Sequence, residues 1–157
     1  MKTKFLLISL FISSFSIAQI KVFKGKSKYS SDILYNLDKH KIFKKNSNYS
    51  SDVICNVSGN KIFKGMSNYS SDVIFNVSDN KVFKANSNYS SDVIMNIRNG
   101  KIYKGNSNYQ SDVIANVKDG KVFAGTSNYS NDIEFSIDGL VTIEEFVAIW
   151  YAVKYAY

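Results

Sequence analysis

Two side chains that are suited to binding chemistry recur along the chain every 20 residues. One is a tyrosine, whose ring has an apolar face and a hydroxyl that hydrogen-bonds, so a row of exposed rings would suit a ligand surface. The other is an aspartate, and a row of carboxylates would suit a metal ion. The tyrosines are Tyr29, Tyr49, Tyr69, Tyr89, Tyr109 and Tyr129, and the aspartates are Asp32, Asp52, Asp72, Asp92, Asp112 and Asp132.

Each row also has a purely structural interpretation. Tyrosines packed between copies would be core residues, and the neighbouring Ser and Asp rows would supply partners for their hydroxyls. That buried arrangement is the simpler hypothesis for the tyrosines. For the aspartates we favour capping of backbone N–H groups or pairing with lysine, because one carboxylate per copy falls short of the six to eight oxygens that Ca²⁺ prefers.

Catalytic chemistry is poorly represented. The one histidine, His40, occupies a position that other copies fill with Asn, Gly or Leu, which argues against a His-based triad or a His-ligated zinc site. A Gly-rich phosphate loop is missing too. We therefore predict that the protein is not an enzyme and needs no cofactor.

The recurring residues belong to a 20-residue repeat with six copies over 21–140. Each copy contains two β-rich segments, such as 61–65 and 72–77, and the chain has no proline. Asn99-Gly100 is typical of a type I′ hairpin turn, which pairs Ile97 with Ile102. This register predicts one face that carries Val93 with Ile97, and an opposite face that also has apolar content.

Two positions of the repeat vary in informative ways. The fifth is Gly in four copies but Lys45 and Ala85 in the others, which argues against a required positive φ. The fifteenth accepts Tyr, Cys, Phe, Met and Ala, so it is a tolerant apolar slot, and Cys55 there is a small hydrophobic residue.

A short fixed period indicates a unit that buries its apolar surface against copies of itself. We predict an all-β repeat protein in which six 20-residue β-hairpins form an open solenoid or elongated sheet, capped by one C-terminal α-helix. A parallel two-sheet β-solenoid is the alternative. A closed form with twelve strands agrees with the strand count, although a β-trefoil would require a 40-residue period.

The period becomes helical in the tail, 141–157. Thr142 and Glu145 form a capping-box pattern, and Phe146, Ile149 and Trp150 follow at helical spacing. We predict a helix that covers the open end of the array. A sorting signal or membrane-active helix is the alternative.

One segment of the tail resembles an EF-hand loop with its exit helix. Over 134–146, Asp138, Gly139 and Glu145 match the fifth, sixth and twelfth loop positions. The resemblance implies a calcium site built from Glu134, Ser136, Asp138 and Glu145. The segment departs from the EF-hand pattern because Glu134 replaces the first Asp and a repeat strand precedes it.

The N-terminus resembles an export signal. Residues 1–18 join a basic start to a short apolar run that ends in Ser16-Ile17-Ala18, so we expect a signal peptide cleaved after Ala18, with an uncleaved anchor as the alternative. Loss of Lys2 and Lys4 lowers the formal net charge from +7 to +5. We expect a secreted or cell-surface protein that does not span the membrane after cleavage.

These expectations favour a non-enzymatic binding module for glycan or another extracellular polymer, with the tyrosines as contacts. The hairpin layout resembles choline- and glucan-binding wall modules, but the chain lacks their paired tryptophans, so no site carries over. A structural spacer or self-associating surface protein is the alternative. The surplus charge permits weak attraction to polyanions, although nucleic acid is an unlikely partner.

Overall fold

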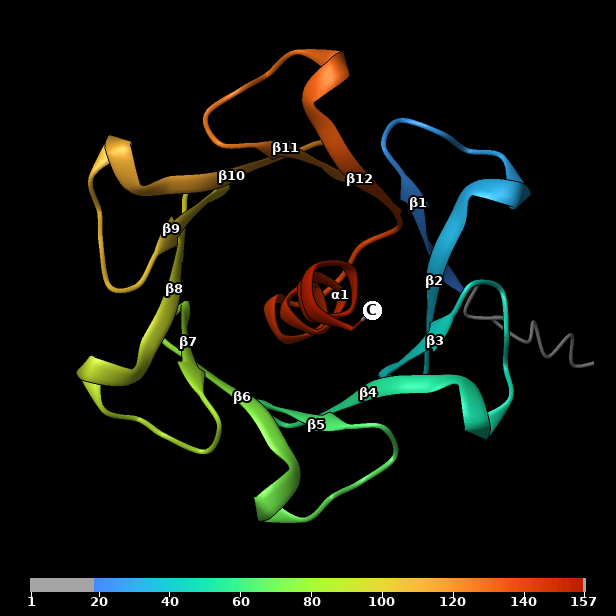
Figure 1. The fold of residues 1–157 in the computed structure, drawn as a ribbon, viewed down its shortest axis with the longest axis horizontal. Helices are drawn as coiled ribbons and strands as arrows, with labels where there is room; N and C mark the ends of the chain where they lie inside the picture. Colours follow the sequence, from blue (N-terminus) through green and yellow to red (C-terminus); the bar gives the residue numbers. More distant parts are fainter. Residues whose placement is uncertain (1–18, 157) are drawn as a thin grey trace, which may run out of the picture.

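The computed structural model describes residues 19–156, which form a closed antiparallel barrel of twelve strands around one helix (Figure 1). Tight turns and longer outer loops alternate between the strands, and each outer loop contains one short 3₁₀ turn. The strands are β1 Ile20–Lys24, β2 Ile33–Asp38, β3 Lys41–Lys44, β4 Val53–Ser58, β5 Lys61–Lys64, β6 Val73–Ser78, β7 Lys81–Lys84, β8 Val93–Arg98, β9 Lys101–Lys104, β10 Val113–Lys118, β11 Lys121–Ala124 and β12 Ile133–Asp138. The helix is α1, Ile143–Tyr155.

The prediction of antiparallel hairpin repeats with a C-terminal helix is confirmed, but the open solenoid is wrong. β1 pairs with β12, with Lys21 opposite Asp138 and Lys24 opposite Phe135, so the first and sixth copies meet. Each copy adds the same rotation to the sheet, and a β-bulge in every pair that flanks an outer loop sharpens the bend. The rotation per copy is a tertiary quantity, and six copies complete the circle without leaving an edge.

The tight turns follow the predicted register. Ile97 lies opposite Ile102 and Arg98 opposite Lys101, while Asn99 and Gly100 have φ of 52° and 73°. Two consecutive positive φ angles are characteristic of the type I′ turn, whose twist matches the flanking strands.

The predicted face assignment is wrong at Val93. The register shifts between Val82 and Phe83 on β7, so that Val82 faces Met95 and Phe83 faces Val93, leaving Ile94 as the extra residue of β8. Ile94 packs against the central core beside Met95, whereas Val93 is buried outside that core. A bulge of this kind cancels strict alternation over one residue.

The fifth position of the repeat has a positive φ in the copies with alanine and lysine as well as in those with glycine. The angle is 52° at Ala85 and 50° at Lys45, against 55° at Gly65. The expectation that this site avoids positive φ is therefore wrong. The backbone must turn here to leave the barrel, and the N–H of Gly65 still donates to the carbonyl oxygen of Ile54 at 2.9 Å.

Because of this strain, removing the methyl group of Ala85 and adding one at Gly65 should change the free energy of unfolding in opposite directions. An L-residue in the left-handed region costs about 1–2 kcal/mol, partly offset by the greater entropy of glycine in the unfolded chain. We expect Ala85→Gly to raise the free energy of unfolding by about 1 kcal/mol and Gly65→Ala to lower it similarly. An added Cβ at Gly65 meets only the Val53 carbonyl oxygen at 3.9 Å, so no clash confuses the comparison. Urea denaturation measures both, and a loss of stability in Ala85→Gly would contradict the strain.

The predicted C-terminal helix is present as α1. Because the barrel is closed, α1 fills the centre of the barrel (Figure 1). Its side chains from Glu145 to Trp150 are all buried, as is Ala152, which is the pattern of a helix surrounded by core. The predicted capping box is present, with Thr142 Oγ1 accepting from the Glu145 N–H and Glu145 Oε2 accepting from the Thr142 N–H. Lys154 donates to Glu134 Oε1 at 2.6 Å and ties the end of the helix to β12.

The helix also explains why the fifteenth position varies. These side chains point inward, and one helix cannot present the same surface to six equivalent strands. α1 lies closest to β4, where the slot is Cys55, whose Sγ lies 3.7 Å from the Ala148 carbonyl oxygen. Burial raises the pKa of the Cys55 thiol to about 12, so it stays protonated and inert at neutral pH. Where there is more room, Phe75 contacts Tyr151 edge-on with ring centroids 5.7 Å apart.

Exchange of these two slot residues tests the match between wall and helix. The double variant Cys55→Phe/Phe75→Cys keeps composition and total side-chain volume, so six equivalent slots would tolerate it. Because the helix is close to β4, we expect overpacking at one slot and a cavity at the other, which together lower the free energy of unfolding by about 4 kcal/mol. Chemical denaturation measures the change, and an unaltered midpoint would show that the slots are interchangeable.

Candidate functional site: a ring of outer loops

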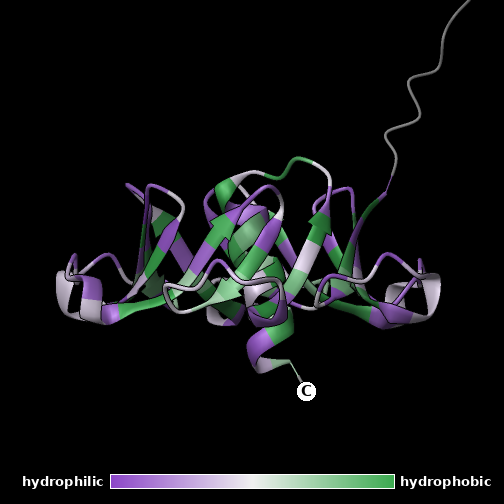
Figure 2. Cartoon of the chain, turned by 90° about the horizontal axis from the view of Figure 1, so that it is seen from above, coloured by the Kyte–Doolittle hydropathy of each residue, from purple (hydrophilic) through white to green (hydrophobic). Residues whose placement is uncertain are grey.

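Six outer loops project from one end of the barrel, because antiparallel strands that alternate tight turns with long loops place each kind of connection at its own end. Figure 2 shows them extending sideways at the end where the C-terminus emerges. We number them outer loops 1 to 6, for residues 25–32, 45–52, 65–72, 85–92, 105–112 and 125–132.

A serine at the seventh position of the repeat holds each outer loop in shape. In outer loop 2, Ser47 Oγ accepts from the Tyr49 N–H at 3.2 Å and donates to Asp52 Oδ2 at 2.5 Å. The Asp52 N–H then donates to the Tyr49 carbonyl oxygen at 2.9 Å and closes the 3₁₀ turn. The same hydroxyl–carboxylate bond joins Ser27 to Asp32, Ser67 to Asp72, Ser87 to Asp92, Ser107 to Asp112 and Ser127 to Asp132.

The aspartates thus have a structural role inside their own loops. The predicted partners, backbone N–H groups or a lysine, are replaced by a serine hydroxyl, which the sequence interpretation did not name. That serine is present in all six copies, and its spacing of five residues from the aspartate was the available signal.

Beneath the outer loops lies a second apolar layer, separate from the core around the helix. Phe43 lies opposite Val53, and the equivalent pairs recur around the barrel. Asn56 on β4 donates through Nδ2 to the carbonyl oxygens of Gly65 and Ser67, at 2.9 and 2.8 Å, and so ties one copy to the next loop. Corresponding bonds reach Ser47, Ser87, Ser107 and Ser127 from Asn36, Asn76, Asn96 and Asn116.

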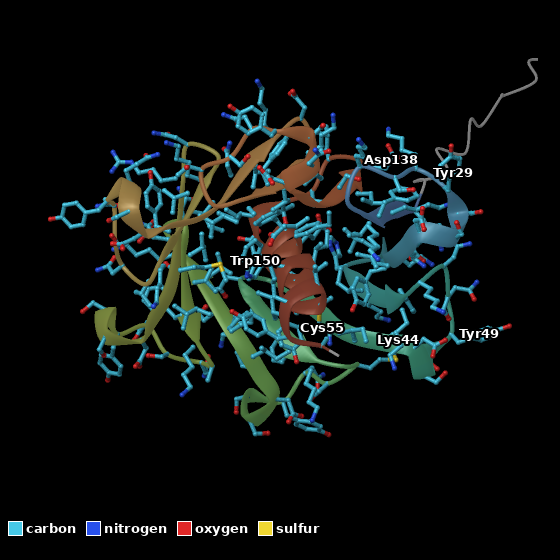
Figure 3. All side chains as sticks on the ribbon, turned by 45° about the horizontal axis from the view of Figure 1, so that its top comes forward. Tyr29, Lys44, Tyr49, Cys55, Asp138 and Trp150 are labelled. Atoms are coloured by element: carbon cyan, nitrogen blue, oxygen red, sulfur yellow. The ribbon has the colours of Figure 1, made fainter. Side chains whose placement is uncertain are left out.

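The tyrosines are exposed, contrary to the expectation that they pack between copies. The exposed fraction of these residues is 72–79% in all six loops. Figure 3 shows Tyr29 and Tyr49 on neighbouring outer loops, away from the barrel, whereas Cys55 and Trp150 lie inside it. The backbone of each tyrosine is held by the serine and aspartate, which leaves the ring free to meet a ligand.

Outer loops 1 and 6 each bend around a shallow hollow beside the tyrosine. In outer loop 1 this hollow has a volume of about 820 Å³ and is lined by Lys24, Lys26, Ser27, Lys28, Tyr29 and Asp32. In outer loop 6 the equivalent hollow is about 640 Å³ and is lined by Ala124, Thr126, Ser127, Asn128, Tyr129 and Asp132. The two sets occupy the same six repeat positions, so the two loops share one concave site.

The arrangement of six hairpins around a central axis agrees with a family comparison. The family described as 6-fold beta flower protein matches residues 22–150. The chain belongs to this family. No curated protein and no solved structure matches the chain. The beta flower fold therefore accounts for the barrel and the helix, and the function has to be argued from the outer loops.

The four residues of the EF-hand resemblance are not brought together. Glu134 pairs with Lys154, and Asp138 lies 3.8 Å from Lys28 across the surface. Glu145 caps the helix and contacts His40 Nδ1 at 2.9 Å, while Ser136 is a buried strand residue. Within residues 19–156, no group of three or more His, Cys, Asp or Glu side chains is placed to hold a metal ion.

Two expectations from the sequence concern other parts of the chain. The predicted signal peptide, 1–18, lies outside the described residues. Among the described residues, no helix has both the length and the apolar character needed to cross a membrane.

The serine–aspartate clamp predicts a local loss when the serine is removed. In Ser67→Ala the Tyr69 N–H loses its acceptor and Asp72 loses its donor, so we expect the free energy of unfolding to fall by about 1–2 kcal/mol. Amide exchange at Tyr69 should also accelerate, as NMR would show. Ser70→Ala, at an exposed position of the same loop, is the matched control and should change neither quantity. Equal exchange in the two variants would contradict the clamp.

Proposed function

We propose that this beta flower protein is a secreted or cell-surface binding module whose outer loops contact glycan or a similar extracellular polymer. One observation carries the proposal: six tyrosine rings are displayed on structured loops at equivalent positions around one end of the barrel. The proposed export rests on the signal-like N-terminus.

Because the tyrosine ring is exposed, packing between copies does not explain why a tyrosine recurs in every copy. The fold does not need the ring, since the clamp uses only the tyrosine backbone. Other positions have diverged among the copies, both the buried slot at the fifteenth position and the exposed sixth position of the repeat. Retention of one aromatic residue at an exposed site in all six copies, while the exposed sixth position changes, supports a surface role. The sixth position holds Lys26, Asn46, Met66, Asn86, Asn106 and Thr126.

The chemistry of the loops suits a polymer with apolar and hydroxylated faces. A tyrosine offers a broad amphipathic ring and has only two side-chain torsions to order, so its contacts cost little entropy. Amide groups such as Asn48 lie one residue from the tyrosine on the same loop. A shallow hollow binds one sugar unit weakly, but six on a rigid ring raise the effective concentration for a repeating ligand.

We expect replacement of all six tyrosines by alanine to abolish retention on glycan arrays or isolated cell walls. The melting temperature should change little, because exposed substitutions have small effects on stability. Variants with one, three and six replacements should lose binding more steeply than in proportion, as multivalency requires.

The matched control replaces the exposed tenth residue of each copy, Ser30, Ser50, Ser70, Ser90, Gln110 and Ser130, by alanine and should keep binding. Full binding by the variant without tyrosines would overturn the proposal. Absence of any glycan binding, together with tyrosine-dependent self-association in sedimentation, would replace it with the structural role.

A further inference from the structure

Outer loop 1 differs from the other five in charge. Its hollow contains three lysines, Lys24, Lys26 and Lys28, around the exposed ring of Tyr29. The neighbouring outer loop 6 presents no lysine at the same positions, which hold Ala124, Thr126 and Asn128. The two loops are adjacent because β1 pairs with β12, so a basic and an uncharged version of one site lie side by side.

We propose that outer loop 1 is the anchoring site for an acidic polysaccharide, with the lysines meeting its carboxylate or sulfate groups and Tyr29 its sugar ring. This inference rests on the proposed binding function and names the substrate class of one loop. The loops with fewer lysines then take the same polymer mainly through their tyrosines.

Asp32 and Asp138 place two negative charges beside the three lysines of this hollow, so it keeps a net positive charge. The Asp32 carboxylate is engaged by the Ser27 hydroxyl at 2.6 Å. Asp138 lies 3.8 Å from Lys28 Nζ, but the two side chains are 59% and 76% exposed, so solvent screens the pair and it contributes little. A polyanion with several closely spaced groups competes effectively for such lysines.

The tether that holds the other outer loops is also altered at this loop. Five copies use a strand asparagine to bond the following loop, whereas the sixth has Ser136, whose Oγ is buried without a hydrogen-bond partner. Outer loop 1 follows Ser136 around the barrel, because β12 is the neighbour of β1. The loop with most charge is therefore the one without this asparagine tether, which gives it more freedom to adjust to a polymer.

The basic surface continues in one direction around the ring. Outer loop 2 begins with Lys45, preceded by Lys44, while outer loop 6 on the other side of outer loop 1 is uncharged at the equivalent positions. A polymer anchored at outer loop 1 is thus drawn toward outer loop 2. The fourth position of the repeat also carries Lys64, Lys84 and Lys104, but the additional lysines, Lys26, Lys28 and Lys45, are confined to these two loops. They form a small basic footprint, unlike the extended basic face that neutralises many phosphates of a nucleic acid, and this favours a polysaccharide.

The repeat supplies its own test, because the sequences of outer loops 1 and 6 can be exchanged. Lys24→Ala/Lys26→Thr/Lys28→Asn gives outer loop 1 the residues of outer loop 6, and Ala124→Lys/Thr126→Lys/Asn128→Lys does the reverse. Each sequence already exists in a folded loop of this protein, and thermal melting verifies both variants. The probes are polygalacturonate, heparin, neutral dextran and a DNA duplex, measured by calorimetry on the chain from Gln19.

We expect the first variant to lose about tenfold in affinity for the acidic polysaccharides, and the second to gain a comparable factor, while dextran binding is unchanged in both. Preference for polygalacturonate or heparin identifies the anion as carboxylate or sulfate. The preference should weaken as salt is raised.

Equal affinity of the wild type and the first variant for both acidic polymers would overturn the inference. If dextran binding then still depended on the tyrosines, the proposed binding function would stand without it. Binding of the DNA duplex more tightly than either polysaccharide would also overturn it. Failure of all polysaccharides to bind would overturn the inference and the proposed function together.

Discussion

The structure depends on filling the interior of a twelve-stranded barrel. Eight strands enclose a space that their own side chains fill, and a barrel of twelve is wider. The inward residues of this barrel are of moderate size, including Ile42, Ile62 and Val82, so they leave an axial space. α1 occupies it and places Trp150 against Phe135 from the wall. Without the helix, the apolar lining would face a cavity, and the barrel would lose the surface against which every hairpin packs.

The wall of the barrel is built from six similar copies, whereas the single helix inside it has no six-fold symmetry. This mismatch explains much of the variation among copies. The inward second position of the repeat, which holds Ile42 and Val82, stays nearly constant as valine or isoleucine. The slot that faces the helix varies from Ala115 to Phe135, because the helix approaches some strands more closely than others. Cys55 occupies the slot on β4, the strand that α1 approaches most closely.

In the outer loops, the groups that stabilise the loop differ from the side chain that is exposed to a ligand. Serine, aspartate and backbone groups hold each loop, and a second apolar layer supports it from below, so the tyrosine ring has no structural task. The repeat departs most from its pattern in the last copy, which meets the first copy where β1 pairs with β12. Ser136 replaces the asparagine there, and Ala124 replaces the lysine. Because the barrel closes, these changes in the last copy act on the first outer loop.

Much of the local structure was determined by the sequence itself. Asn99-Gly100 specified a turn and hence a register, Thr142 and Glu145 specified the start of a helix, and the period specified six equal hairpins, all through contacts between residues close in sequence. Neither closure nor the place of α1 was predictable, because both depend on the rotation per copy, summed over the ring.

Some features of the candidate site were likewise predictable from the sequence, and others depended on the tertiary structure. The tyrosine and aspartate rows were visible in the sequence, but burial and exposure demand the same repetition, so the pattern did not show that Tyr49 is exposed. The positive φ at Ala85 was hidden because tertiary hydrogen bonds hold an alanine where glycine is preferred. Adjacency of outer loops 1 and 6, which lie at opposite ends of the chain, was decided only when β1 paired with β12.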